Sequence, residues 1–365
     1  MRATRRLTVA AIAAASALSL SACLASPEQG GEAAGPDDPI VVGVSLPLTG
    51  DFAEPGKGVQ RGYEAWAKHV NENGGLLGRQ VELVIVDDQS NADRVASDYE
   101  RLINQDGVDL VFGPFSTRLV VPAAQVAQDY GFLFVEPAGA AAEVFEQGFD
   151  NLFYAAPAIA DDHYDHLAEY ILALPDDEQP KTIAVASMDD PFAQGTAYGL
   201  RDQLAEAGIE VLVDEVYPPN TTDFSGIAAK IADSKADLLI VGSQYQDGVN
   251  LVVALQQQDY QPQMAAISGA PTNAEFPAAI GDKTEGILAP TGYTPTAPYP
   301  SNEEFVEPRN ELLLALGARV GALSWDAQGR PQSAHLIQQY VDGEIKIVLP
   351  DDVKEADLVH PKPAW

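Results

Sequence analysis

Short apolar runs alternate along the chain with longer stretches in which apolar residues recur at helical spacing. In the first part of the chain, four such runs predict buried strands: Ile40–Leu46, Val81–Val86, Val108–Phe112 and Phe132–Val135. The stretches between them predict helices near Gly58–Asn73, Asp93–Gln105 and Arg118–Tyr130. Strands that alternate with helices predict a parallel sheet with helices on both faces.

A second series with the same alternation begins near Leu152. Its predicted strands are Thr182–Ala186, Glu210–Val216, Asp237–Val241 and Met264–Ile267. Its predicted helices are His163–Ala173, Ala193–Ala207, Phe224–Asp233 and Gly248–Gln258. The two series predict an α/β fold of two doubly wound, Rossmann-like lobes with parallel sheets.

The C-terminal region departs from this alternation. Leu336–Val341 and Glu344–Leu349 flank Asp342-Gly343, a pair that favours a tight hairpin turn. Residues 350–365 contain several prolines and are expected to form an extended tail.

The first residues have the layout of an export signal. Three arginines precede an apolar run from Leu7 to Leu20, which is short for a membrane span and ends at Leu20-Ser21-Ala22-Cys23. This end resembles the bacterial lipobox, in which the Cys is diacylated and the chain is cut before it. The resemblance predicts that residues 1–22 are a signal peptide and that Cys23, the only cysteine, carries the lipid anchor. The alternative is an ordinary signal peptide with an incidental cysteine.

The amino-acid composition limits which classes of molecule the protein can bind. Residues 23–38 hold Gly, Pro and acids without periodicity, which is typical of a flexible tether. The whole chain has 21 basic and 54 acidic residues, with a formal net charge of −33. Nucleic acid is excluded as a natural partner, because no basic surface is available to replace its counterions.

The sequence offers little support for catalysis. It contains no Gly-x-Ser-x-Gly, His-Glu-x-x-His or Gly-x-Gly-x-x-Gly motif. Asp161-Asp162-His163-Tyr164-Asp165-His166 is a possible metal cluster, but an acidic helix start with exposed histidines explains it better. We therefore expect no enzymatic activity, no metal and no cofactor.

The informative loops lie where predicted strands end. They are Pro47–Phe52, Gly113–Thr117 and Glu136–Ala141. In open α/β sheets ligands bind at the carboxyl edges of the strands, and helix N-termini there favour anionic groups. These loops predict a site for an anionic or strongly accepting group, although routine βα turns would have a similar composition.

Several motifs in combination resemble the type I periplasmic binding proteins of branched-chain amino acid and amide importers. They cover residues 40–305 and beyond: Val44–Gly50, Asn71–Arg79, Val86–Ser90, Gly113–Thr117 and Leu323–Gly329. The resemblance implies two lobes joined by a hinge, a small molecule captured between them, and delivery to an ABC permease in the membrane.

The resemblance also implies which residues bind the ligand. Phe115, Ser116 and Thr117 would hold a carboxylate, with help from Ala138, Gly139 and Ala140, where the family often has a Thr at the position of Ala140. Phe52 would line the cleft from the first lobe. From the second lobe, Phe192 and Tyr245 would close over the ligand, and Gly269 and Ala270 would lie where the family carries its ammonium-binding acid. No acid stands at Ser268–Pro271, so an amide or an aromatic acid fits better than a zwitterionic amino acid.

The resemblance sets expected boundaries and one departure. The first lobe should span residues 39–157, with 293–320 returning to it, and the second lobe residues 158–292, with 321–349 as a hairpin region. Between Phe305 and Leu323, family members have two helices that cover the first lobe, whereas this chain has room for one, at most Asn302–Leu316. We therefore expect shortened last helices and a first lobe that is the less stable of the two.

The sequence thus predicts a lipid-anchored substrate-binding protein on the outer face of the cytoplasmic membrane. It would capture an amino acid, amide or related organic acid by hinge closure. Two alternatives stay open: an envelope hydrolase on the same α/β architecture, and a ligand-sensing or degenerate binding protein that is not coupled to transport.

Overall fold

The computed structural model describes residues 38–281, 283–292, 294 and 325–365. The predicted signal peptide, Cys23, the tether up to residue 37 and the shortened segment at 306–322 lie outside the described residues. Residues Pro39–Trp365 form one compact unit that contains two sheets. No helix among the described residues has the length and apolar character needed to cross a membrane.

The first sheet is parallel throughout and has the strand order β2-β1-β3-β4-β5. Its strands are β1 (Ile40–Leu46), β2 (Val81–Asp87), β3 (Leu110–Phe112), β4 (Phe134–Glu136) and β5 (Leu152–Tyr154). The helices of this part of the chain are α2 (Ala53–Glu72), α3 (Ala92–Asn104), α4 (Thr117–Asp129) and α5 (Ala142–Glu146). These elements confirm the predicted parallel α/β arrangement of this part of the chain, but Leu152 starts the last strand of the first sheet and not the second series.

The second sheet has the order β12-β11-β10-β9-β8-β6-β7. Its strands are β6 (Thr182–Met188), β7 (Glu210–Tyr217), β8 (Leu238–Gly242), β9 (Met264–Ile267), β10 (Ile287–Thr291), β11 (Leu336–Val341) and β12 (Glu344–Leu349). The antiparallel pair β11 and β12 is the predicted hairpin. The helices are α6 (Asp165–Ala173), α7 (Pro191–Glu206), α8 (Ser225–Ser234), α9 (Tyr245–Leu255) and α10 (Phe276–Ile280), with short 3₁₀ turns η1 (Ala160–Asp162) and η2 (Ala270–Thr272).

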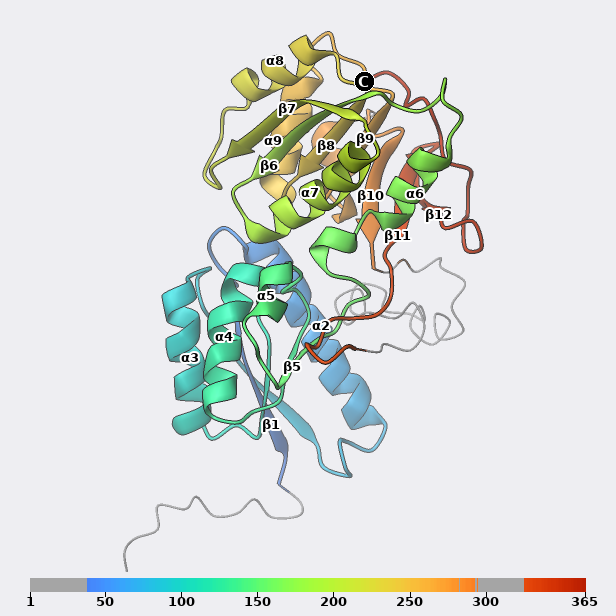
Figure 1. Ribbon diagram of the computed structural model, residues 1–365. Coiled ribbons are helices and arrows are strands. Elements are labelled where there is room, and N and C mark those ends of the chain that lie inside the picture. The colour runs from blue at the N-terminus through green and yellow to red at the C-terminus, as the bar shows by residue number, and fades with distance from the viewer. Residues whose placement is uncertain (1–37, 282, 293, 295–324) are drawn as a thin grey trace, which may run out of the picture. The chain divides into compact units, whose positions relative to one another are not determined.

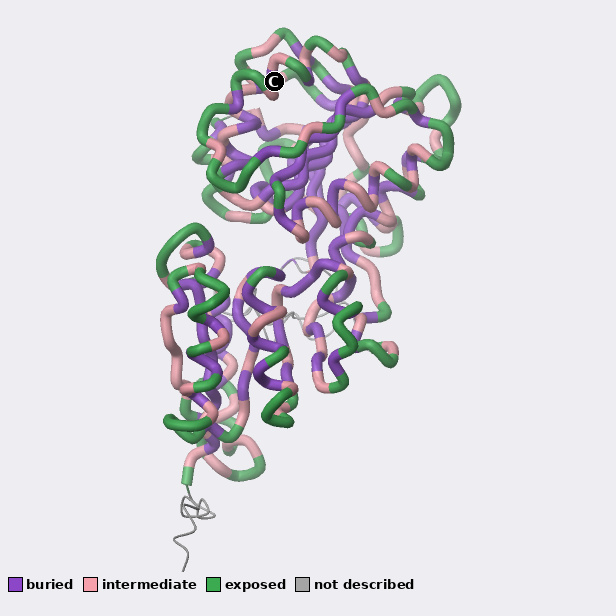
Figure 2. Tube along the Cα trace, turned by 60° about the vertical axis from the view of Figure 1, so that its left-hand side comes forward, coloured by how far each residue is buried: buried purple, intermediate pink, exposed green. Residues whose placement is uncertain are grey.

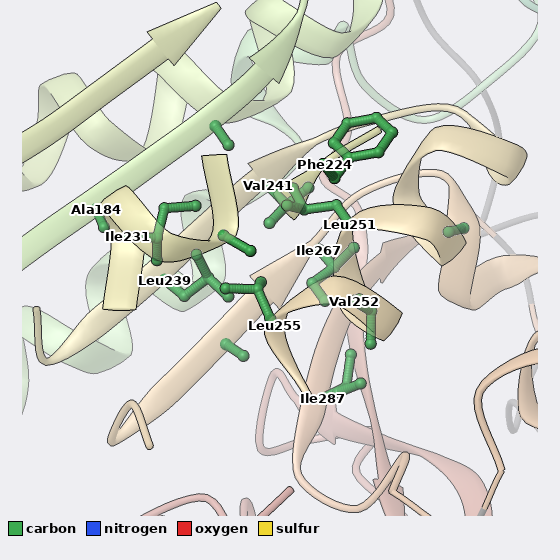
Figure 3. Close-up of a cluster of buried hydrophobic side chains, with 14 of the residues drawn as sticks. Ala184, Phe224, Ile231, Leu239, Val241, Leu251, Val252, Leu255, Ile267 and Ile287 are labelled. Atoms are coloured by element: carbon green, nitrogen blue, oxygen red, sulfur yellow. The ribbon is translucent and has the colours of Figure 1, made fainter. Parts of the chain in front are cut away.

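Helices cover both faces of the second sheet (Figure 1). On one face, α8 and α9 bury a cluster that includes Ile231, Leu251 and Leu255 against Leu239 and Val241 of β8 (Figure 3). On the other face, α6 and α7 pack on Ile183, Val185, Leu238 and Ile240. Every residue of β8 is buried, as expected for a central parallel strand.

The first sheet is covered less evenly. On one face, α3 and α4 bury Tyr99, Leu102 and Leu119. On the other face, α2 contributes Val59, Tyr63 and Ala67 against β1 and β2. Edge strand β2 is only partly buried along most of its length, whereas β1 is almost wholly buried. The strands of the second sheet, by contrast, are buried over long continuous stretches (Figure 2).

Both sheets change winding direction once. The chain moves from β1 to β2 on one side and returns to β3 on the other, and it moves likewise from β6 to β7 and returns to β8. The loops after β1 and β3 therefore diverge at one edge, as do the loops after β6 and β8. Such switch points are where open α/β sheets bind ligands.

Candidate functional site

A chamber of about 320 Å³ lies where strands of both sheets end. In the first sheet its lining comes from the segments after β1, β3 and β4 and from the end of β5, and in the second sheet from the segments after β6, β8 and β9. The lining residues are Pro55, Phe115, Ser116, Pro137, Ala138, Ala140, Tyr154, Phe192, Gln244, Tyr245, Gly269, Thr272 and Asn273. Most are apolar or neutral, and none is charged.

Ser116 is a polar residue of the first-lobe wall. It precedes helix α4, and its backbone has a φ of 82°, which few residues other than glycine adopt. Its Oγ is buried without a hydrogen-bond partner. The first N–H groups of a helix have no intrahelical acceptor, so the start of α4 and this hydroxyl offer donors on one side of the chamber.

The neighbouring loop is held from within by Glu136. This residue ends β4 and is fully buried, and its Oε2 accepts hydrogen bonds from the N–H groups of Ala138 at 2.7 Å and Gly139 at 2.5 Å. Burial raises the pKa of Glu136 to about 8, against the lowering effect of these two bonds. The N–H groups of Ala138 and Gly139 are thereby engaged with a protein carboxyl.

The first turns of helices α7 and α9 form much of the second-lobe wall. Asp190 caps α7 by accepting from the N–H groups of Phe192 and Ala193, each at 3.1 Å. At α9, Gln244 and Asp247 form a reciprocal capping box, and Tyr217 donates to Asp247 Oδ2 at 2.8 Å. The caps fix the helix starts from which Phe192 and Tyr245 line the chamber.

The loop after β9 approaches this wall closely. Gly269 has a φ of 69°, and a Cβ there would lie 2.2 Å from the carbonyl oxygen of Ser243, so only glycine fits. Ser268 Oγ accepts from Ser243 N and from Thr196 Oγ1, which ties β8, β9 and α7 together. The second-lobe wall is consequently braced by a buried polar network.

Two further cavities adjoin the chamber. One of about 360 Å³ shares Tyr154 and Phe192 with it and reaches His163 and His335. The other, of about 510 Å³, shares Gln244 and Tyr245 and opens toward the loops at 50–55 and 219–222. The cleft is therefore longer than the chamber alone.

The structure brings together most of the residues that the sequence singled out. Seven line the chamber: Phe115, Ser116, Ala138, Ala140, Phe192, Tyr245 and Gly269. Phe52 lines the outer cavity instead, with its ring centroid 6.0 Å from that of Phe115.

The remaining three predicted residues lie behind the wall. Thr117 is buried, and its Oγ1 accepts from Ala141 N at 3.3 Å. Gly139 packs under its loop against Val120 and Glu136. Ala270 is fully buried at the start of η2. None of the three is among the residues that line the chamber.

Sequence reasoning missed five lining residues: Pro55, Tyr154, Gln244, Thr272 and Asn273. Pro137 lies within the predicted strand-end loop Glu136–Ala141. Gln244 comes two residues after β8, so applying the strand-end rule to this strand as well would have found it. Tyr154 ends β5, a strand of three residues that is too short to show a period.

The expectation of exposed histidines at the start of α6 is wrong for His163. Its ring is buried, stacked on His335 with centroids 3.8 Å apart and edge-on to Phe192. His335 comes from a distant part of the chain, which no local pattern reveals. Within the described ranges, no group of three or more His, Cys, Asp or Glu side chains is placed to hold a metal ion.

A family model described as periplasmic binding protein matches residues 39–310. The chain belongs to the periplasmic binding protein family. The family is one of solute-binding proteins, and the resemblance read from the sequence motifs is confirmed.

Named relatives and solved structures of periplasmic binding proteins agree with this assignment. "Leu/Ile/Val-binding protein homolog 1" of Brucella abortus (strain 2308) is 29% identical over 257 residues, which are 70% of this chain and 67% of that protein. The binding protein LivJ of Streptococcus pneumoniae, solved in complex with isoleucine, has a TM-score of 0.72 at 18% identity and covers 89% of this chain and 100% of its own.

A solute-binding protein of R. palustris, solved in complex with benzoate, also has a TM-score of 0.72 at 18% identity. The match covers 90% of this chain and 98% of that one. At this identity the two solved structures establish the shared fold of this periplasmic binding protein.

Proposed function

We propose that this chain captures a small carboxylate-bearing molecule in the chamber and delivers it to an ABC permease. The observation that carries the proposal is the buried, unpartnered Oγ of Ser116 at the start of α4, inside a chamber lined from both sheets. A carboxylate there would accept from this hydroxyl and from the free N–H groups of the helix start. The named relative is a homolog of Leu/Ile/Val-binding proteins, and the two solved structures contain isoleucine or benzoate, all of which carry a carboxylate.

The rest of the ligand would lie among aromatic rings. Phe115 and Tyr154 line the chamber from the first lobe, and Phe192 and Tyr245 line it from the second. A planar apolar body packed among these rings would lose much of its exposure to water. Because these rings come from both lobes, binding would favour closure of the lobes around the ligand.

The charge of the chamber favours an aromatic acid or an amide-bearing acid over a zwitterionic amino acid. Its lining contains no carboxylate that could pair with an ammonium group. Two buried acids lie behind the lining: Glu136 accepts from the N–H groups of its own loop, and Asp190 accepts from the N–H groups that start α7. An ammonium group in this chamber would therefore lose its hydration without gaining a full counter-charge.

A thermal-shift screen tests the proposal. The full chain is heated with benzoate, L-isoleucine, L-leucine and benzamide, where benzamide has the shape of benzoate without its charge. Benzoate is expected to raise the melting temperature most, since a ligand at 100 times its Kd adds about 2.7 kcal/mol of stability. The absence of a shift with every carboxylate would reject the proposed ligand class, and a larger shift with isoleucine would reject the charge argument.

We further propose that Cys23 carries a lipid anchor that keeps the protein at the outer face of the cytoplasmic membrane. The support is the Leu20–Cys23 sequence behind a basic, apolar leader. Cys23→Ser is expected to release the protein from membrane fractions. Intact-mass measurement of the purified wild-type protein gives the second test, and a mature chain with unmodified Cys23 would contradict the anchor.

A further inference from the structure

The two sheets are joined by segments that meet at one pair of histidines. The first connection leaves β5 through Pro157 and reaches His163 just before α6. The third runs from the segment at Trp325–Pro331, where Trp325 donates to the carbonyl of Tyr154, to His335 just before β11. The His163 and His335 rings stack with centroids 3.8 Å apart and an interplanar angle of 36°.

The second connection touches the same pair. Gly292 follows β10, and a Cβ placed on it would lie 3.1 Å from Cδ of Pro157 and 3.4 Å from Nε2 of His335. The stacked rings therefore contact, or lie beside, all three segments that link the sheets. Any rotation of one lobe on the other must change the surroundings of this pair.

The pair lies at the edge of the cavity of about 360 Å³, and within the described residues no carboxylate is hydrogen-bonded to either ring. Both rings are buried, and neither Nδ1 has a hydrogen-bond partner. His163 Nε2 lies 3.3 Å from the carbonyl oxygen of Ala158, which is a neutral acceptor. Phe192 of α7 packs edge-on against His163 at a centroid distance of 5.8 Å.

The ionisable groups around the pair make their contacts elsewhere. Asp161 lies against Gly195 and Gly199 of α7, and Asp165 accepts from Gln203. Asp190 caps α7, and Glu136 accepts from its own loop. The segments that carry the pair also hold the buried phenols of Tyr154 and Tyr164, the half-buried carboxyl of Asp162, and Arg330, which acts on Asp162.

We propose that the His163–His335 stack is a pH-sensitive latch on the hinge. Two neutral imidazoles can stack in this site, whereas one imidazolium would be buried beside a second ring without a carboxylate partner. Acid would therefore separate the rings, open the hinge and weaken ligand capture. The arrangement described here is the neutral, latched state.

The direction of the pH effect follows from the proton affinity of the two rings in the latched and open states. Burial lowers the pKa of His163 to about 4, and burial together with the neighbouring His163 lowers that of His335 well below its usual value. If opening returns the pKa of one ring to about 6.5, lowering the pH from 7.5 to 5 shifts the equilibrium between the latched and open states toward the open state by about 30-fold. The latch holds above pH 6.5 and is lost as the pH falls toward 4.

The test uses the full chain without any ligand, so its outcome does not depend on the proposed ligand class. Imidazole titration is followed by NMR from pH 7.5 to 4, and the radius of gyration is followed by small-angle X-ray scattering. In the wild type, two rings are expected to take up protons late and together with an increase in the radius of gyration. Titration of all five histidines as free imidazoles, or a radius of gyration that does not change, would overturn the proposal.

Variants assign the effect to the pair. His163→Gln with His335→Gln is expected to abolish the acid-dependent increase, because glutamine does not titrate. His69→Gln on the exposed side of α2 is the matched control and should retain it. An increase that persists in the double variant would contradict the latch. If the double variant does not fold, His335→Gln alone, together with the wild-type titration, still decides the question.

Discussion

Glu136 Oε2 accepts the N–H of Gly139 at 2.5 Å, so a buried carboxyl holds the loop that walls the chamber from below. Its pKa is about 8 in the folded chain, against 4.5 for a free glutamate. The folded chain thus binds this proton more tightly than the unfolded chain. The stability that Glu136 contributes is present below pH 4.5 and is lost as the pH rises through 8.

Glu136→Gln keeps an acceptor for the loop and removes the titration. We expect the variant to gain stability relative to the wild type as the pH rises from 5 to 8, by up to about 1.4 kcal/mol per pH unit. Urea unfolding at pH 5 and pH 8 measures the difference. Glu82→Gln on the exposed side of β2 is the control, and a Glu136→Gln difference that does not change with pH would contradict the assignment.

Gly199 of α7 lies directly on the connection that follows β5. A Cβ there would lie 1.9 Å from the carbonyl oxygen of Asp161, which is backbone and cannot move away easily. Gly199→Ala is therefore expected to lower the free energy of unfolding by about 1–3 kcal/mol despite the better helix propensity of alanine.

Gly226 of α8 provides the matched control, because nothing lies within 4 Å of the position that a Cβ would occupy there. Gly226→Ala should be neutral or should add about 0.5–1 kcal/mol. Both values are read from urea unfolding at a single pH. Equal effects of the two substitutions would show that the contact with Asp161 does not constrain α7.

Strands β2 and β8 differ in how completely the described structure covers them. All residues of β8 are buried, whereas most residues of β2 are half-buried. We expect the amides of β2 to exchange with solvent earlier than those of β8 in a dilute monomer, as hydrogen exchange with mass spectrometry would show. Equal protection would mean that the first lobe is as stable as the second and would contradict the prediction of a shortened, weaker first lobe.

The alternation of apolar runs and helical stretches was enough to predict both sheets and most element positions. The strand-end rule then located Ser116 and Ala138, because each follows a strand within a few residues, whereas Tyr245 came from the family resemblance. Prediction failed where contacts join distant parts of the chain. His163 looks like a surface residue among acids, and only the stack with His335 explains its burial.

At the site, two helices begin several residues earlier in the chain than the sequence predicted, for a related reason. The helix predicted from Gly58 begins at Ala53, and that predicted from Gly248 begins at Tyr245. In both cases the first turn carries Gly, Pro or polar residues, which lack helical periodicity. The capping contacts of Gln244 and Asp247 define the start of α9 instead, and they depend on Tyr217 from β7.

The central claim is that a carboxylate binds at Ser116 between the lobes, and calorimetric titration of benzoate tests it most directly. Ser116→Ala removes the unpartnered hydroxyl, and we expect a loss of affinity of about 10- to 100-fold, the effect of one hydrogen bond to a charged group. Ser97→Ala, at an exposed serine of α3 that bonds only to Asp93 O, should bind as the wild type does. Tyr245→Ala should weaken binding by about 1–3 kcal/mol. Benzoate affinity that is unchanged in both Ser116→Ala and Tyr245→Ala would contradict the account.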